Sequence, residues 1–200
     1  MTDVARSWQV LLIGGASGVG KSSISYRIAQ HFGVGMTEID DFIEVLKVMT
    51  TPEQQPVLHY WDTNPEAAQL SPKEIVKLTV AVGEVMQPAI EAVIINHLLS
   101  FAPVVLDGDY LLPALAAQTS FGDIPNAGQV RAIFLHEPDE EQIRVNYRKR
   151  EPEQGDQAFR AHVSWLYGEW LKLAAEHAGV TVLNARPWGN LFERVLEAIE

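Results

Sequence analysis

The stretch GGASGVGKSS, Gly14 to Ser23, constrains the fold of this 200-residue chain more than any other segment. It fills the pattern GxxxxGK[ST] between the apolar run QVLLI and a segment with helical spacing. Glycines allow a tight turn with inward-pointing N–H groups, and the N-terminus of the following helix adds a positive dipole. A strand, a glycine-rich turn and a helix in this order predict a loop that binds a triphosphate.

The loop supplies most of the expected nucleotide contacts. Lys21 contributes a mobile positive charge that we also expect to act in catalysis, and the Ser22 hydroxyl is a ligand of the kind that Mg²⁺ prefers. A glycine-rich turn that binds nothing is the alternative, which the match at all eight positions disfavours. The nucleotide contacts expected from this loop are Gly15, Ala16, Ser17, Gly18, Val19, Gly20, Lys21, Ser22 and Ser23.

Short apolar runs alternate with helical patterns along the whole chain. Five runs read as strands, at residues 9–13, 35–39, 103–108, 129–135 and 180–185. Strands that alternate with helices form parallel sheets covered on both faces. The chain therefore predicts one domain over residues 1–200, a three-layer α/β/α sandwich around a five-stranded parallel sheet.

Residues 43–101 are expected to form a helical insertion that binds the acceptor. Residues 50–70, rich in Pro, Gln and Asn, are too long for an ordinary loop. A long helix follows from Ser71, which opens a capping box with Glu74, and Pro88 is expected to kink or divide it. The apolar stretch AVIINHLLSFAPVVL is interrupted by polar residues and Pro103, so no transmembrane helix is expected.

Charge and composition exclude several classes of function. A net charge of −11 and an isoelectric point near 4.9 would repel nucleic acid and anionic bilayers, so neither is an expected partner. The chain has no cysteine, which excludes disulfides and thiol catalysis. We expect a cytoplasmic monomer or homodimer that binds a small molecule.

Acidic residues directly follow two of the predicted strands. Asp40 and Asp41 follow GMTEI, and Asp107 and Asp109 follow VVL. Ligands of parallel sheets lie beyond the carboxyl ends of the strands. We expect Asp107 to hold Mg²⁺ together with Ser22, and Asp40 to receive the proton of an acceptor hydroxyl, with Asp109 the second candidate for that role. The alternative is that Asp41 is a helix N-cap and Asp-Gly-Asp a turn.

The segment EPDEEQIRVNYRKRE is expected to form an arginine-rich lid over residues 144–160. Arg144 and Arg148 are four residues apart, hence on one helical face, with Arg150 close by. We expect Arg144 to contact the nucleotide and Arg148 to stabilise charge on the transferred phosphoryl group. An acidic start and a basic end also complement a helix dipole, which is the structural alternative.

The stretch NARPWGN after the last strand is the candidate site for the base of the nucleotide. A resemblance to P-loop kinases, which often hold the adenine ring at this segment, implies that Arg186 and Pro187 are base contacts. Trp188 is expected to pack against the C-terminal helix, whose apolar residues include Leu191 and Val195.

The segments GGASGVGKSS, IDDF, VVLDGDYLLP and RVNYRKRE together resemble the P-loop small-molecule kinases of the nucleoside and shikimate kinase group. Within it, the first and third segments are most similar to archaeal-type 2-phosphoglycerate kinases. The resemblance implies a P-loop NTPase fold with ATP and Mg²⁺ as cofactors. The chain departs from that family by placing Asp109 and Tyr110 where the family has valine and histidine.

These two residues, with Asp40, are the expected contacts of the acceptor. A carboxylate beside the acceptor would repel a phosphorylated acid and would suit a neutral polyol, a sugar-like antibiotic or an amine-bearing alcohol.

The sequence therefore predicts an ATP-dependent phosphotransferase that moves the γ-phosphate to a hydroxyl of a small molecule, whether a phosphorylated acid, a sugar or polyol, or an antibiotic-like compound. The alternative is a regulatory P-loop NTPase switch that acts through a protein partner. The chain has no Asn-Lys-x-Asp motif for reading guanine, which favours adenine as the base.

Overall fold

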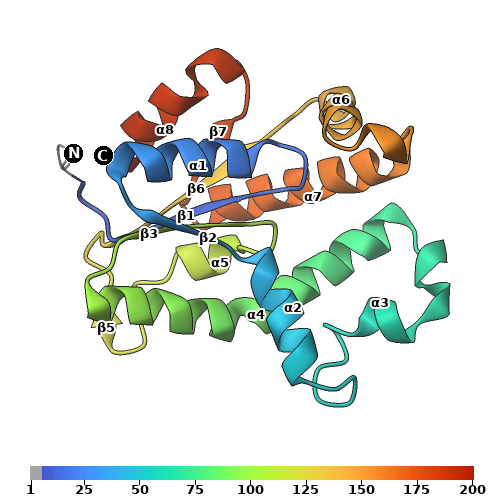
Figure 1. Cartoon of the computed structure of the whole chain (residues 1–200), viewed down its shortest axis with the longest axis horizontal. Coiled ribbons are helices and arrows are strands. Elements are labelled where there is room, and N and C mark those ends of the chain that lie inside the picture. The colour runs from blue at the N-terminus through green and yellow to red at the C-terminus, as the bar shows by residue number, and fades with distance from the viewer. Residues whose placement is uncertain (1–5) are drawn as a thin grey trace.

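The computed structural model describes residues 6–200 and contains the predicted sheet (Figure 1). Five parallel strands pair in the order β2-β3-β1-β6-β7. They are β1 (Val10–Gly15), β2 (Gly35–Glu38), β3 (Val104–Gly108), β6 (Val130–His136) and β7 (Thr181–Asn184). The five predicted strands and the three-layer α/β/α architecture are confirmed.

The helices connect these strands and cover both faces of the sheet. They are α1 (Lys21–Phe32), α2 (Asp40–Met49), α3 (Tyr60–Thr63), α4 (Pro72–Ser100), α5 (Pro113–Ala116), α6 (Glu140–Arg150), α7 (Ala158–His177) and α8 (Leu191–Ile199). Three short 3₁₀ helices are η1 (Pro65–Gln69), η2 (Pro152–Gln154) and η3 (Trp188–Asn190). In Figure 1, α1 and α8 lie on one side of the sheet, and α4, α5 and α7 lie on the other.

Apolar residues on both faces of the central strands hold the layers together. Leu11 and Ile13 of β1 belong to a buried cluster that includes residues of α1 and α8. Val10 and Leu12 alternate with them and belong to a second cluster with residues of α4. Because a parallel sheet is buried on both faces, its strands are continuous apolar runs, which is why QVLLI was recognisable as a strand.

Helix α4 begins and ends where the sequence predicts. The Ser71 hydroxyl accepts a hydrogen bond from the Glu74 N–H, and the Glu74 carboxylate accepts one from the Ser71 N–H at 2.8 Å. Of the kink or division expected at Pro88, the division is wrong, because α4 runs through this residue as one helix. Pro88 is exposed, so water can satisfy the carbonyl that lacks its usual N–H partner.

By length and composition alone, α4 could cross a membrane, which sets it apart from the other helices of residues 6–200. Its residues Met86, Ile90 and Ile94 are fully buried against the sheet. The predicted absence of a transmembrane helix rested on a shorter stretch of this segment, and it stays a prediction.

Two regions lie next to the carboxyl edge of the sheet. The first is the predicted insertion, which consists of α2, α3, η1 and α4; the second half of α4 also packs under the sheet. The second region is the predicted lid, formed by the end of α6, η2 and the start of α7. A small antiparallel pair, β4 (Ser120–Phe121) with β5 (Ile124–Pro125), was not predicted, because two-residue strands have no readable periodicity.

Candidate active site

The loop between β1 and α1 has a backbone that only glycine can adopt at its two ends. Gly15 and Gly20 have φ angles of 143° and 99°. A Cβ atom on Gly15 would lie 2.6 Å from the Leu135 carbonyl oxygen, and one on Gly20 would lie 2.5 Å from the Trp188 ring. The loop opens onto the N-terminus of α1, whose first turn holds no acidic side chain. This helix terminus is therefore free to attract an anion.

Lys21 is the buried cation of the site. Its side chain is 7% exposed, and its ammonium donates to the Ala16 carbonyl at 3.2 Å and forms an ion pair with Asp109. Burial by itself lowers the pKa of Lys21, but the nearby carboxylates of Asp109 and Asp107 outweigh it and raise that pKa above its ordinary value. Lys21 is therefore charged, and its charge is balanced by the acidic residues predicted from the strand ends.

Among residues 6–200, Asp107 is the most deeply buried carboxylate, at 1% exposure. Neither of its oxygens has a hydrogen-bond partner among the described residues. Burial raises its pKa above the ordinary value, with Lys21 acting in the opposite direction. Since a buried carboxylate without a hydrogen-bond partner is costly, Asp107 is suited to bind a cation.

Asp107 and Ser22 line the same cavity and fit the Mg²⁺ predicted for this site. Residues 6–200 contain no group of three or more His, Asp or Glu side chains disposed to hold a metal ion. Mg²⁺ is commonly held by one or two protein ligands together with phosphate oxygens and water, so two ligands here suffice.

Glu38 is an acidic site residue that the sequence reasoning missed. It ends β2 and is paired in register with Asp107 of β3, and it lines the cavity with Asp107. Its charge adds to the repulsion that raises the pKa of Asp107. Glu38 is contained in the predicted strand GMTEI, but its position beside Asp107 depends on the strand register, which the sequence does not show.

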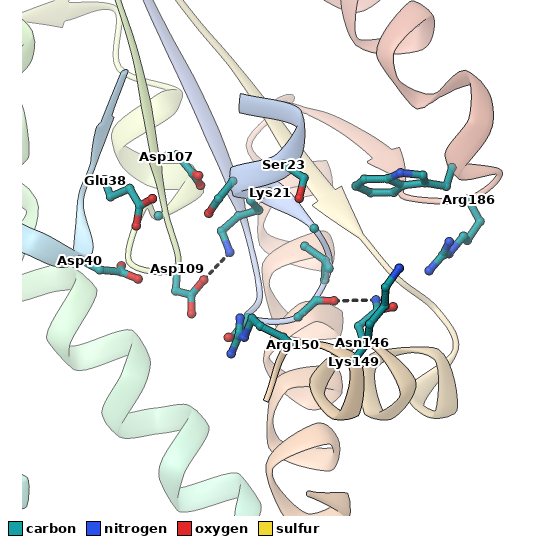
Figure 2. Close-up of a pocket in the computed structure, with 17 residues that line it drawn as sticks. Lys21, Ser23, Glu38, Asp40, Asp107, Asp109, Asn146, Lys149, Arg150 and Arg186 are labelled. Atoms are coloured by element: carbon teal, nitrogen blue, oxygen red, sulfur yellow. Dashed lines mark hydrogen bonds and ion pairs between the residues drawn. The ribbon is translucent and has the colours of Figure 1, made fainter. Parts of the chain in front are cut away.

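Asp40 and Asp109 line the cavity on the same side of Lys21 (Figure 2). Asp40 keeps part of its surface open to the cavity, yet burial of its carboxyl group and the charge of Asp109 raise its pKa to about 6. The Tyr167 hydroxyl donates to the Asp109 backbone carbonyl at 2.7 Å and fixes that turn. The predicted contact Tyr110 is not among the residues that line the cavity; burial, with Asp109, raises its pKa to about 12.

Helix α6 brings a different set of basic residues to the cavity from the one predicted. Asn146, Lys149 and Arg150 line the cavity, whereas Arg144 and Arg148 do not. The two predicted arginines lie on another face of α6. Arg144 makes two hydrogen bonds of 2.6 Å to Asp156 and one of 3.0 Å to Glu141. Arg148 pairs with Glu141 at 2.8 Å.

The same helix is bonded to the phosphate loop. The Asn146 amide donates to the Gly18 carbonyl at 2.8 Å, and a Cβ on Gly18 would approach Ile143 within 3.0 Å. Tyr147, fully buried, hydrogen-bonds through its hydroxyl with Ser164 of α7 at 2.7 Å. Helix α6 is thus in contact with both the loop and α7.

The segment after β7 supplies the remaining wall. Arg186 lines the cavity, and its Nε donates at 3.0 Å to Glu137, which is 2% exposed. Trp188 lines the cavity beside Gly20, and it also packs against the buried cluster that contains Leu191 and Val195 of the C-terminal helix, as predicted. Pro187 is not among the lining residues. Base binding by this segment stays a prediction.

These side chains surround one cavity of about 620 Å³ (Figure 2). Lys21 occupies its centre, with the carboxylates on one side and Asn146, Lys149 and Arg186 on the other, while Arg150 lies below Lys21, next to Asp109. Of the predicted nucleotide contacts, Ser17 to Ser23 line the cavity. Gly15 and Ala16 do not, although Ala16 holds Lys21 through its carbonyl. A cavity of this volume is typical of small-molecule sites.

No family model matches the chain. Over 139 residues it is 27% identical to the 2-phosphoglycerate kinase of Methanothermobacter thermautotrophicus, an alignment that covers 66% of this chain. The chain spans 44% of that curated relative.

Two solved structures are similar over nearly their full lengths. A shikimate kinase from Acinetobacter baumannii in complex with shikimate matches with a TM-score of 0.52 and 12% identity, covering 96% of this chain and 93% of that chain. A gluconokinase from Sinorhizobium meliloti 1021 matches with a TM-score of 0.50 and 20% identity, covering 98% and 93%. The chain is thus similar to P-loop small-molecule kinases, as its motifs predicted, and it shares the fold of these two structures.

Proposed function

We propose that this protein is an ATP-dependent phosphotransferase that transfers the γ-phosphate to a hydroxyl group of a small molecule. One observation carries the proposal: the lysine of the phosphate loop meets Asp40, Asp107 and Asp109 within one cavity. A loop that only bound phosphate would need the lysine and the backbone N–H groups. The carboxylates near the lysine add a group that can orient a hydroxyl acceptor and accept its proton.

The loop side of the cavity would hold the nucleotide. Lys21, the loop N–H groups and the N-terminus of α1 attract the phosphates, and Lys149 and Arg150 add positive charge from α6. Ser22 and Asp107 would hold Mg²⁺, which when bound neutralises part of the phosphate charge. Because the described side chains leave Asp107 without a partner, this role also satisfies a buried carboxylate.

The opposite side would position the acceptor. A carboxylate with a pKa of about 6 is mostly ionised at neutral pH and can still accept a proton readily, as a general base must. We assign this role to Asp40. The oxygen of the acceptor hydroxyl bonds to the γ-phosphorus, the bond between the γ-phosphorus and ADP breaks, and Asp40 takes the hydroxyl proton. Catalysis then rests on positioning and electrostatic stabilisation.

The test is Mg²⁺-dependent release of ADP from ATP by the purified protein, alone and with a panel of hydroxyl compounds. We expect one acceptor class to stimulate release, and Lys21→Ala to lower it by roughly 10³-fold because the central phosphate-binding charge is lost. Lys172→Ala removes a lysine on the far part of α7 and is the matched control. Circular dichroism and thermal melting would show that both variants are folded.

An active Lys21→Ala protein would contradict the assignment of the loop. Slow hydrolysis that no small molecule stimulates, and that changes only when a protein partner is added, would favour the regulatory NTPase switch instead.

A further inference from the structure

The charge of this chain is distributed unevenly between its two halves. Residues 33–125, which include β2, α2, α3, α4 and β3, contain thirteen acidic residues, three lysines and no arginine. This part therefore carries a formal charge of −10 out of the total of −11. The remaining residues, which include the phosphate loop, α6, α7 and α8, are nearly balanced.

The same division runs through the cavity. Residues 33–125 contribute the carboxylates Glu38, Asp40, Asp107 and Asp109 to its lining and contribute no cation, while all the lining cations within residues 6–200 come from elsewhere in the chain. Lys47, the lysine of residues 33–125 that is nearest to Asp40 along the chain, forms an ion pair with Asp62 at 2.7 Å. An anionic acceptor on this side would meet four carboxylates and no cation from residues 33–125.

Binding of the nucleotide increases this imbalance. In the structure, Lys21 pairs with Asp109, and its charge also acts on Asp40, where it opposes the rise in pKa caused by burial. A lysine that turns to the phosphates leaves Asp109 without that ion pair. Asp107, whose buried oxygens have no hydrogen-bond partner among the described residues, would be satisfied by the Mg²⁺ proposed above. Asp40 and Asp109 then face the acceptor as two carboxylates, to which residues 33–125 add no cation.

We propose, on the basis of the phosphotransferase function above, that the acceptor is a hydroxyl compound that carries a protonated amine, such as an amino alcohol or an amino sugar. The ammonium group replaces Lys21 as the partner of Asp109, while Asp40 faces the hydroxyl that is phosphorylated. In the step itself, the hydroxyl oxygen bonds to the γ-phosphorus, ADP leaves, and the hydroxyl proton passes to Asp40. The amine takes no part in bond formation and acts as the recognition group.

The test compares acceptors that differ in charge on related skeletons. One series is 2-aminoethanol, ethylene glycol and glycolate, and the other is D-glucosamine, D-glucose and D-gluconate. ADP release gives kcat/KM for each compound, and phosphorus NMR identifies the phosphorylated product. We expect the amine-bearing member to exceed the neutral member at least tenfold in one series, and the anionic member to be the poorest.

A variant separates charge recognition from a structural effect. Asp109→Asn should lower the preference for D-glucosamine over D-glucose about tenfold, because the neutral amide removes the ammonium partner and keeps the shape of the side chain. Asp123→Asn makes the same change at the exposed turn between β4 and β5 and should leave the preference unchanged. A variant whose rates fall equally with both sugars would indicate a merely structural role for Asp109.

The outcomes distinguish the two proposals. Faster transfer to glycolate or D-gluconate than to the amines, or a panel in which no amine is phosphorylated, overturns the inference about the acceptor. Transfer to any panel compound still supports the phosphotransferase. If the protein neither binds ATP nor releases ADP under any of these conditions, both proposals are contradicted.

Discussion

The two walls of the cavity differ in how their side chains are held. On the loop wall, Gly20 lies against the Trp188 ring with no room for a Cβ, and Lys21 is almost completely buried. On the α6 wall, Lys149 and Arg150 lie at the surface, and the neighbouring Arg144 and Arg148 pair with acidic residues outside the cavity. The backbone conformation of the loop fixes the positions of its side chains. On the α6 wall, the rotation of the helix about its axis decides which side chains point into the cavity.

This difference explains which site predictions were informative. A glycine-rich loop has few ways to fold, so its residues could be assigned from their order alone. A spacing of four residues shows that Arg144 and Arg148 share a helical face, but not that this face meets Glu141 and Asp156. The cavity face of α6 carries Asn146, Lys149 and Arg150, which have the same kind of spacing.

The largest effect is expected from a methyl group on the loop wall. Gly20→Ala combines a φ of 99° with a contact of 2.5 Å to Trp188, so it should cost about 2–4 kcal/mol of unfolding free energy and abolish nucleotide binding. Gly179→Ala also has a positive φ, of 69°, but open space around it, and should cost about 1 kcal/mol. Denaturant melts and ATP titration measure the two effects. Equal losses of unfolding free energy in the two variants would mean that the cost at Gly20 comes from backbone strain and not from the contact with Trp188.

The next effect distinguishes the two faces of α6. Arg150→Ala should lower kcat by about 10²-fold, since it removes a charge that lines the cavity. Arg148→Ala should change kcat less than about twofold, because its partner is the exposed Glu141. Steady-state ADP release with saturating ATP measures both. A larger loss with Arg148→Ala would show that α6 rotates or closes when the nucleotide binds.

A smaller effect concerns pH and the acceptor wall. If ionised Asp40 is the base, kcat/KM should rise tenfold per pH unit up to a pH of about 6 and level off above it, since the ionised form is required. The pH dependence of ADP release measures this rise in kcat/KM. Asp40→Asn should abolish the rise below pH 6 while the residual rate stays measurable. A rise that persists in the variant would show that another group titrates.

The smallest effect is on stability. The pKa of Asp40 is raised in the folded protein from 3.8 to about 6, so its ionisation opposes folding. This penalty is absent below about pH 4, grows as the pH rises and is complete above about pH 6. Asp40→Asn should therefore raise the unfolding free energy at pH 7.5 by about 1 kcal/mol, once screening by solvent at this partly open carboxyl is allowed for. Thermal melts at pH 4 and pH 7.5 measure the difference, which should vanish at pH 4.

Much of the fold could be predicted from the sequence, because continuous apolar runs and turn glycines are local signals. The strand-end carboxylates Asp40, Asp107 and Asp109 were also found in this way, and the cavity brings all three together. Glu38 and Trp188 were missed as cavity residues because their positions depend on strand register and on a contact between distant segments. Such relations are properties of the folded chain and leave no mark within a short stretch of sequence.

The hydrogen bonds around the cavity limit how it can open. The Asn146 amide ties α6 to the phosphate loop, Tyr147 ties α6 to α7 through Ser164, and Tyr167 of α7 holds the backbone of Asp109. Helix α6 therefore cannot swing away as an independent flap without breaking a buried bond or moving α7. Movement of α7 would in turn displace the turn that carries Asp109. Access for the nucleotide and placement of the acceptor are mechanically joined in this protein, on opposite sides of the same cavity.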